Sequence, residues 1–164
     1  MWKAWLFGIC AALLFGAAVP KAQAKDAPAL APFKFDRAHT FITFSLSHFG
    51  FSTAFGVFKT FEPVIVFDPA KPEMTKVEVT IDAASIDTGW PARDEELRSA
   101  YFFNVAKYPK ISFKSSRVER MGEASARLTG DLTLLGVTKP LVLDVKLNKM
   151  APNMMHPEVQ IAGF

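Results

Sequence analysis

The sequence contains one cysteine, Cys10, which lies in an apolar segment at the N-terminus. The rest of the chain therefore lacks the thiols needed for a disulfide, a thiolate metal site or a cysteine nucleophile. It also lacks an excess of charge of either sign. Without residues 1–24, which hold two lysines and no acidic residue, 17 basic residues (19 minus 2) face 16 acidic ones. A nearly neutral chain without a basic run is not expected to bind nucleic acid.

Tyrosine is scarce, with two residues against sixteen phenylalanines. Phe7 and Phe15 lie in the N-terminal segment, so 14 phenylalanines (16 minus 2) remain in the rest of the chain. Their rings are large and carry no polar atom, so they predict an extensive apolar interior with few hydrogen-bonding groups. Composition alone is compatible both with a filled interior and with a long apolar slot.

Histidine is also scarce, with His39, His48 and His156 as the full set. His39 and His48 are nine positions apart, so they are expected on opposite faces of one regular strand, which does not make a metal pair. The sequence predicts no metal site, no catalytic residue and no cofactor.

The N-terminus has the pattern of a secretory signal peptide. Lys3 precedes an apolar run over residues 4–19, and Ala22-Gln23-Ala24 has the small-x-small form of a cleavage site. The alternative is a retained membrane anchor, but the apolar run is short for a span. We therefore expect residues 1–24 to be removed after Ala24, residues 25–32 to form a flexible linker, and residues 33–164 to form one domain.

Most of the remaining chain alternates apolar and polar residues, which predicts β-strands. The expected strands are 39–49, 55–67, 75–82, 110–119, 124–135, 141–147 and 158–164, with a short edge strand at 33–36. Turns or loops are expected at 68–72, 120–123, 136–140 and 150–157. About seven strands with short connections predict an up-and-down antiparallel sheet, and closure into a barrel would remove its exposed edges.

One helix is expected within this all-β pattern. Pro91 suits the first helical position, Asp94 suits the positive N-terminal end of the helix, and Arg98 lies nearer its C-terminal end. A single helix between two strands predicts a plug or lid on the sheet.

The helix is surrounded by charged residues: Asp87, Arg93, Asp94 and Arg98. One hypothesis makes Asp94 a general base beside Arg93. The other makes these residues an ion-pair and capping network that holds the helix over the barrel. We favour the network, because the sequence places no nucleophile or second base beside Asp94. Ser85 and Thr88 are interpreted as turn residues.

Short motifs recur along the chain in a fixed order. They are Asp36-x-x-His39-Thr40, Ser47-His48-Phe49-Gly50, Gly56-x-Phe58, Ile81-Asp82-Ala83-x-Ser85-Ile86-x-Thr88-Gly89, Arg93-Asp94, Leu97-Arg98-Ser99, Phe102-Phe103, Tyr108-Pro109, Phe113-x-Ser115, Gly130-Asp131-Leu132-Thr133 and Gly136-Val137-Thr138-Lys139-Pro140. In this order and spacing, the sequence resembles the YceI-like family of lipid- and polyisoprenoid-binding proteins over residues 33–164.

The resemblance implies an extended, lipocalin-like antiparallel β-barrel with one short helical insert, located in the periplasm. It also implies a non-catalytic carrier of a polyisoprenoid, such as a polyprenyl quinone or polyprenyl phosphate, or of a similar long-chain lipid. Family members usually continue beyond the position of Phe164, so the barrel domain is expected to be C-terminally incomplete. Either the sequence is a fragment or the protein is truncated, and a truncated barrel would be open beside residues 39–49. We further expect transient membrane contact and allow for a homodimer.

Strand parity and the resemblance together nominate the residues that line the ligand space. They are Phe44, Leu46, His48, Phe58, Val79, Ile81, Phe113, Leu132 and Leu134. His48 is expected either to bond the polar head of the ligand or to be a rim residue satisfied by the protein. Two further hypotheses are an enzyme acting on a lipid headgroup through Asp94 and His48, and a stress-related, partner-binding protein with a filled barrel.

Overall fold

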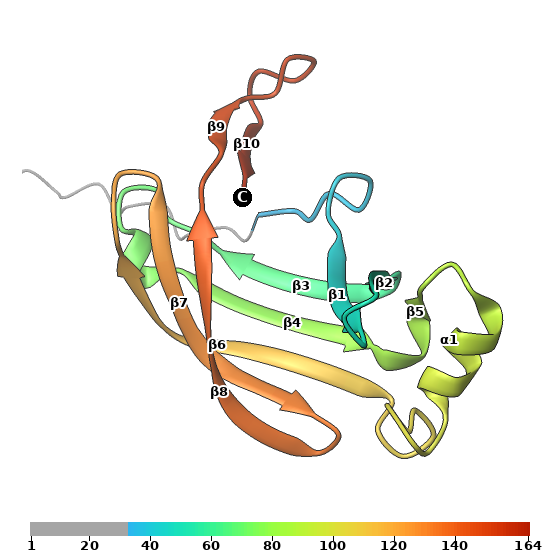
Figure 1. Cartoon of the computed structure of the whole chain (residues 1–164). Coiled ribbons are helices and arrows are strands. Elements are labelled where there is room, and N and C mark those ends of the chain that lie inside the picture. The colour runs from blue at the N-terminus through green and yellow to red at the C-terminus, as the bar shows by residue number, and fades with distance from the viewer. Residues whose placement is uncertain (1–32) are drawn as a thin grey trace, which may run out of the picture.

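The structure, a computed structural model, describes residues 33–164. The predicted signal peptide and linker lie outside the described residues. Within them the chain forms three antiparallel sheets, two short 3₁₀ helices and one α-helix (Figure 1). None of the helices in this range has the length and apolar character required to cross a membrane.

The largest sheet has five strands in the order β3-β4-β6-β7-β8. Their bounds are β3 Phe61–Val66, β4 Lys76–Asp82, β6 Lys110–Arg120, β7 Ser125–Leu134 and β8 Val137–Lys146. Every neighbouring pair is antiparallel, and a register shift between Ser115 and Arg117 marks a bulge in β6. The sheet is strongly curved (Figure 1).

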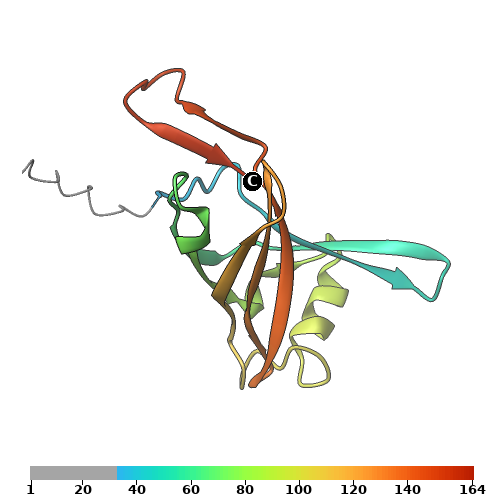
Figure 2. The same ribbon diagram turned by 90° about the vertical axis from the view of Figure 1, so that its left-hand side faces the viewer.

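Two smaller sheets stand beside it. The first contains β1 Ile42–His48, β2 Ser52–Phe58 and β5 Ile86–Asp87, and the second contains β9 Lys149–Pro152 and β10 Gln160–Gly163. The β1–β2 and β9–β10 hairpins both project from the five-stranded sheet (Figure 2). The three sheets do not join into a closed barrel over residues 33–164. The fold class is therefore confirmed: an antiparallel all-β fold with one helical insert, in an open arrangement.

The single long strand predicted over residues 55–67 is wrong, because the chain bends there and forms β2 and β3 in different sheets. Ser85 holds the chain at this bend through hydrogen bonds. Its hydroxyl accepts a hydrogen bond from the Thr60 N–H at 3.0 Å, and its carbonyl accepts one from the Lys59 N–H at 3.1 Å. The same hydroxyl donates to the Asp82 carbonyl at 2.7 Å. Ser85 thus bonds to the backbone at the bend, in addition to lying in a turn.

Two connections near the C-terminus also differ from the prediction. The turn expected over residues 136–140 is shorter and lies earlier. Leu135 and Gly136 form it in the left-handed conformation, at φ 52° and 73°, and β8 begins at Val137. Pro140 is tolerated within β8 because that strand is an edge of the sheet. The expected loop at 150–157 begins instead as β9, which pairs with β10.

The predicted strand 39–49 begins later than expected, at Ile42. His39 lies in the preceding turn, where its Nδ1 is 2.9 Å from Asp36 Oδ2. The strand expected at 33–36 reduces to one bridge between Phe33 and Ile65. The hydrogen bond from His39, and then that from the Ala38 N–H, hold the pKa of Asp36 below its ordinary value. Local side-chain bonding therefore replaces strand pairing in this segment.

The helix is confirmed as α1, Pro91–Arg98, with Pro91 in its first turn, Asp94 in its acidic first turn and Arg98 in its last. The short helices η1 Pro72–Met74 and η2 Ala83–Ser85 flank β4. At the α1 end of the molecule lies a core of Phe58, Ala83, Ile86 and Ile111. Strands from two sheets and the segment after α1 all contribute apolar side chains to this core.

Candidate functional site

Five of the nine residues nominated for the ligand space belong to the five-stranded sheet. Val79, Phe113 and Leu132 are paired in register across β4, β6 and β7. Ile81 is the next inward residue along β4, and it pairs with Ile111 of the core. The predicted alternation of the five-stranded sheet is therefore confirmed by its register.

Five nominated residues meet at the α1 end. Phe58 belongs to the buried core, and the partly buried residues packed against that core include Phe44, Ile81, Leu132 and Leu134. The ring centroids of Phe44 and Phe58 are 5.7 Å apart. These side chains contact one another, so this end of the interior is packed by protein.

Val79 and Phe113 lie farther along the five-stranded sheet. Phe113 is only 7% exposed. Its ring covers Gly130 of β7, where an added Cβ would be 2.8 Å from Phe113 Cε2. Val79 is partly buried. Phe113 is therefore held against the sheet, and Gly130 provides the space that its ring occupies.

Leu46 and His48 are not brought into the packed core. Leu46 is 50% exposed, and His48 is exposed at the end of β1. The His48 ring lies 5.0 Å from the Phe49 ring, in an edge-on arrangement. The structure thus separates His48 from the five nominated residues that meet at the α1 end.

The apolar interior is incompletely covered at two of the sheet edges, β1 and β8. Leu46 of β1 shares a face with Phe44, which packs on the core. On β8, Val137 and Leu143 pair with inward residues of β7 and are 55% and 38% exposed. Each of these side chains keeps apolar area available to an occupant of the interior.

The structure also contains a groove of about 630 Å³ that the sequence did not predict. It lies between the β1–β2 hairpin and the chain leaving β5, and Thr43, Phe55, Val57 and Thr88 are among its lining residues. Of the nominated residues, only Phe44 reaches it. Strand parity assigned Thr43 to the outer face. The aromatic Phe55, which pairs with Ser45, was the sequence signal that could have indicated this groove.

A second, more polar groove of about 500 Å³ shares Asp87 and Gly89 with the first. Its lining includes Lys59 and Arg98 as cations and Asp94 as a second carboxylate. An apolar groove therefore adjoins a polar one with both signs of charge. Such an arrangement suits a ligand with an apolar chain and a polar head.

The polar network around α1 is centred on Thr88. Its N–H and its hydroxyl donate to Asp94 Oδ1 at 2.8 and 2.6 Å. Arg93 Nε donates to Thr88 Oγ1 at 2.7 Å, and Arg93 Nη2 donates to the Thr88 carbonyl at 2.9 Å. Thr88 therefore bridges Arg93 and Asp94, the two residues of the general-base hypothesis.

Arg98 ties the end of α1 to η2 and β5. Its Nε donates to the Ala84 carbonyl at 2.8 Å, and its Nη2 donates to the Ile86 carbonyl at 2.6 Å. The sequence also led us to expect ion pairs of Arg93 and Arg98 with Asp87 or Asp94. Such pairs are absent from residues 33–164. Both arginines bond to backbone carbonyls instead, because the bend around β5 turns these acceptors toward the helix.

Asp94 is 6% exposed, and both hydrogen bonds to its Oδ1 come from the β5–α1 connection. Asp87 is ion-paired with Lys59. The hydrogen bond from Lys59 and then that from the Gly89 N–H, at 2.7 Å, hold the pKa of Asp87 below its ordinary value. The two carboxylates thus fasten β5 to α1 and to the β2–β3 bend.

The part of the chain that the structure describes contains no group of three or more His, Cys, Asp or Glu residues able to hold a metal ion.

Comparison with known proteins relates the fold to one family. The sequence model of the YceI-like domain matches residues 33–164. The UPF0312 protein of Ectopseudomonas mendocina is 44% identical over 138 residues, which cover 83% of this chain and 70% of that protein. Protein YceI of Escherichia coli O157:H7 is 45% identical over 119 residues, or 71% of this chain. The match spans 62% of the length of that E. coli protein. The crystal structure of Burkholderia cenocepacia BcnA superposes with a TM-score of 0.67 at 28% identity, over 71% of this chain and 72% of BcnA.

Proposed function

Because this chain belongs to the YceI-like domain family, we propose that it is a non-catalytic periplasmic carrier of a long-chain lipid. The ligand class is a polyisoprenoid, such as a polyprenyl quinone or polyprenyl phosphate, or a lipid of similar length. The apolar chain of the ligand lies along the inner face of the sheets between the free edges β1 and β8.

The observation that carries this proposal is the partial exposure of inward apolar side chains on those edges, Leu46 on β1 and Val137 and Leu143 on β8. An apolar chain laid across them would remove this area from water. Burial of apolar groups stabilises a complex by about 0.8 kcal/mol per methylene, so a long lipid needs no strong polar contact to be retained.

Selectivity for the head of the lipid comes from the polar groove beside β5. Lys59 and Arg98 supply hydrogen-bond donors, and Asp87 supplies an acceptor. One or two such groups at the mouth of an apolar site orient a ligand without dominating its affinity.

Native mass spectrometry of the purified protein, followed by organic extraction, tests the proposal. We expect a mass excess that corresponds to one polyprenyl or similar long-chain species, recovered intact in the extract. A well-folded protein with only its own mass, which also takes up no lipid when incubated with ubiquinone, would contradict it and favour a filled interior. Recovery of a chemically altered headgroup after incubation would instead support an enzyme.

A further inference from the structure

The turn between β1 and β2 carries the two most exposed phenylalanines in the described chain. Phe49 is 87% exposed and Phe51 is 90% exposed. The turn itself is well held, since the Phe51 N–H donates to the His48 carbonyl at 2.9 Å and the Gly50 N–H donates to Ser47 Oγ at 3.1 Å. Both aromatic rings are thus presented to solvent by an ordered hairpin end.

Phe49 occupies a conformation that disfavours its side chain. Its φ is 51° and that of Gly50 is 80°, so both central residues of the turn are left-handed. Asn, Asp or Gly normally fill the first of these positions, because a bulky side chain is strained there. At 87% exposure, Phe49 gains little packing within the chain in return. A strained, exposed aromatic residue indicates a role outside the folded monomer.

The hairpin that carries this turn is free of charged residues. No Asp, Glu, Lys or Arg lies between Arg37 and Lys59 in the sequence. The hairpin projects away from the five-stranded sheet, with its turn at the far end (Figure 2). Its tip can therefore enter an apolar phase without desolvating a charge and without the body of the protein following it.

We propose that this hairpin tip, Phe49-Gly50-Phe51, docks the protein onto a lipid bilayer by inserting its two rings into the interfacial region. A protein partner is less suited to this surface. Two buried phenylalanines supply roughly 300–500 Å² at about 150–250 Å² each, whereas a stable protein interface needs about 800 Å² per partner. Two rings are sufficient for shallow, reversible membrane contact, in which the turn backbone stays at the hydrated headgroup level.

This docking is independent of any lipid held inside the protein, although it would place a carrier where its ligand is taken up. Because the hairpin has no formal charge, attraction comes from apolar burial and not from lipid charge. Binding to zwitterionic and to anionic vesicles should therefore be similar and should change little with salt.

The test is flotation with vesicles of phosphatidylcholine alone and of phosphatidylcholine with phosphatidylglycerol. The parent and its variants are prepared without residues 1–24 for this test, because the apolar run of residues 4–19 would itself bind lipid. We expect Phe49→Asn combined with Phe51→Ser to weaken partitioning roughly tenfold or more, because both apolar side chains are lost. Phe49→Asn alone should weaken it less and raise the thermal midpoint, since Asn tolerates a positive φ.

The matched control is the tip of the other projecting hairpin. Met154 and Met155 are 97% and 84% exposed between β9 and β10, and Met154→Ser with Met155→Ser should leave partitioning unchanged. Loss of binding in this control but not in the phenylalanine variant would overturn the proposal. So would binding to anionic vesicles only, abolished by salt, because that pattern indicates a cationic surface.

A direct probe uses Phe51→Trp, with the parent protein and its Trp90 as the baseline. We expect the added emission to shift to the blue on phosphatidylcholine vesicles and to be quenched by brominated phosphatidylcholine. An emission unchanged by vesicles would refute insertion of the tip. Loss of internal lipid with retained vesicle binding would refute the carrier function alone.

Discussion

Phe44 of β1 lies over Gly56 of β2, its partner in the strand register, and the ring occupies the space that a side chain at Gly56 would need. A Cβ added at Gly56 would lie 2.7 Å from Phe44 Cε1. The ring cannot easily move, because it is packed on the core and against Phe58. This contact fixes how the β1–β2 hairpin is anchored at the α1 end of the molecule.

Gly56→Ala should therefore destabilise the protein by about 1–3 kcal/mol, the usual cost of overpacking a core. Urea unfolding monitored by circular dichroism measures the change. Gly163→Ala is the control, because its Cβ would meet only the Lys149 carbonyl at an ordinary 3.9 Å. Equal stabilities of the two variants would show that Phe44 does not need this space.

Replacement of an inward residue at the free edge tests the ligand surface. Leu143→Glu should reduce co-purified lipid by about tenfold or more, equivalent to 1.4 kcal/mol, because a carboxylate would face the apolar chain. Val142→Glu is the control: Val142 is adjacent on β8, faces the other side and is 50% exposed. Lipid per protein is measured by mass spectrometry of the extract. A similar loss in both variants would argue against an inner-face site.

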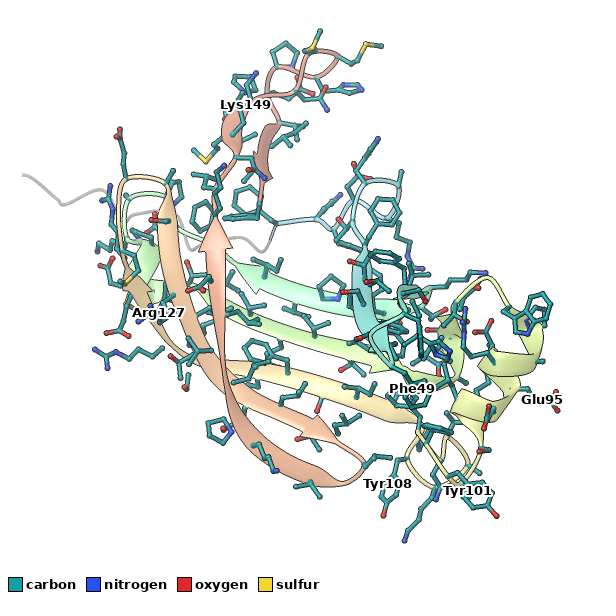
Figure 3. The ribbon with its side chains drawn as sticks, in the orientation of Figure 1. Phe49, Glu95, Tyr101, Tyr108, Arg127 and Lys149 are labelled. Carbon is teal, nitrogen blue, oxygen red and sulfur yellow. The ribbon has the colours of Figure 1, made fainter. Side chains whose placement is uncertain are left out.

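Asp94→Asn tests the role of the buried carboxylate. The amide oxygen can still accept from Thr88, but the charge is lost, so we expect a destabilisation of about 1–3 kcal/mol. Lipid retention per folded protein should not change. Glu95→Gln is the control on the same helix, because Glu95 is exposed and points away from the sheets (Figure 3). Any lipid-headgroup conversion that disappears in Asp94→Asn would favour the general-base hypothesis.

The ion pair of Asp87 with Lys59 predicts a pH dependence of stability. The pKa of Asp87 is lowered on folding, so its contribution is present above the ordinary value of 3.8 and is lost as the pH falls through the folded pKa. Lys59→Met removes the larger cause of the shift. We expect the variant to unfold at a higher pH than the parent in acid titration, with the two proteins converging once Asp87 is protonated in both. An NMR titration of the Asp87 carboxyl group gives its pKa directly. An identical Asp87 pKa in the two proteins would contradict the assignment.

Several features were predictable from the sequence because they depend on neighbouring residues. The alternation in β4, β6 and β7 identifies strands and their inward faces, and it also placed Phe113 and Leu132 on one side. Pro91, Asp94 and Arg98 marked the beginning and end of α1 through local helix preferences. The paired left-handed residues Leu135 and Gly136 were missed because Pro140, downstream, was interpreted as part of the turn.

The site was less predictable, because parity gives the face of a residue and not what it contacts. Phe44 and Phe58 were nominated as lining, and their rings pack together at the α1 end. Thr88 was interpreted as a turn residue, yet it joins Arg93 to Asp94. No spacing in the sequence indicates these contacts, since they depend on where β5 lies relative to α1.

The sequence by itself determined the all-β class, the position of the helix, the near-neutral charge and the uncharged stretch between Arg37 and Lys59. Each is a property of composition or of short-range periodicity. Only the tertiary structure decided that the chain bends at Lys59 and Thr60, where Ser85 supplies hydrogen bonds from 25 residues away. It likewise decided which apolar side chains fill the core and which stay exposed at the β1 and β8 edges, because burial depends on packing between elements distant in sequence.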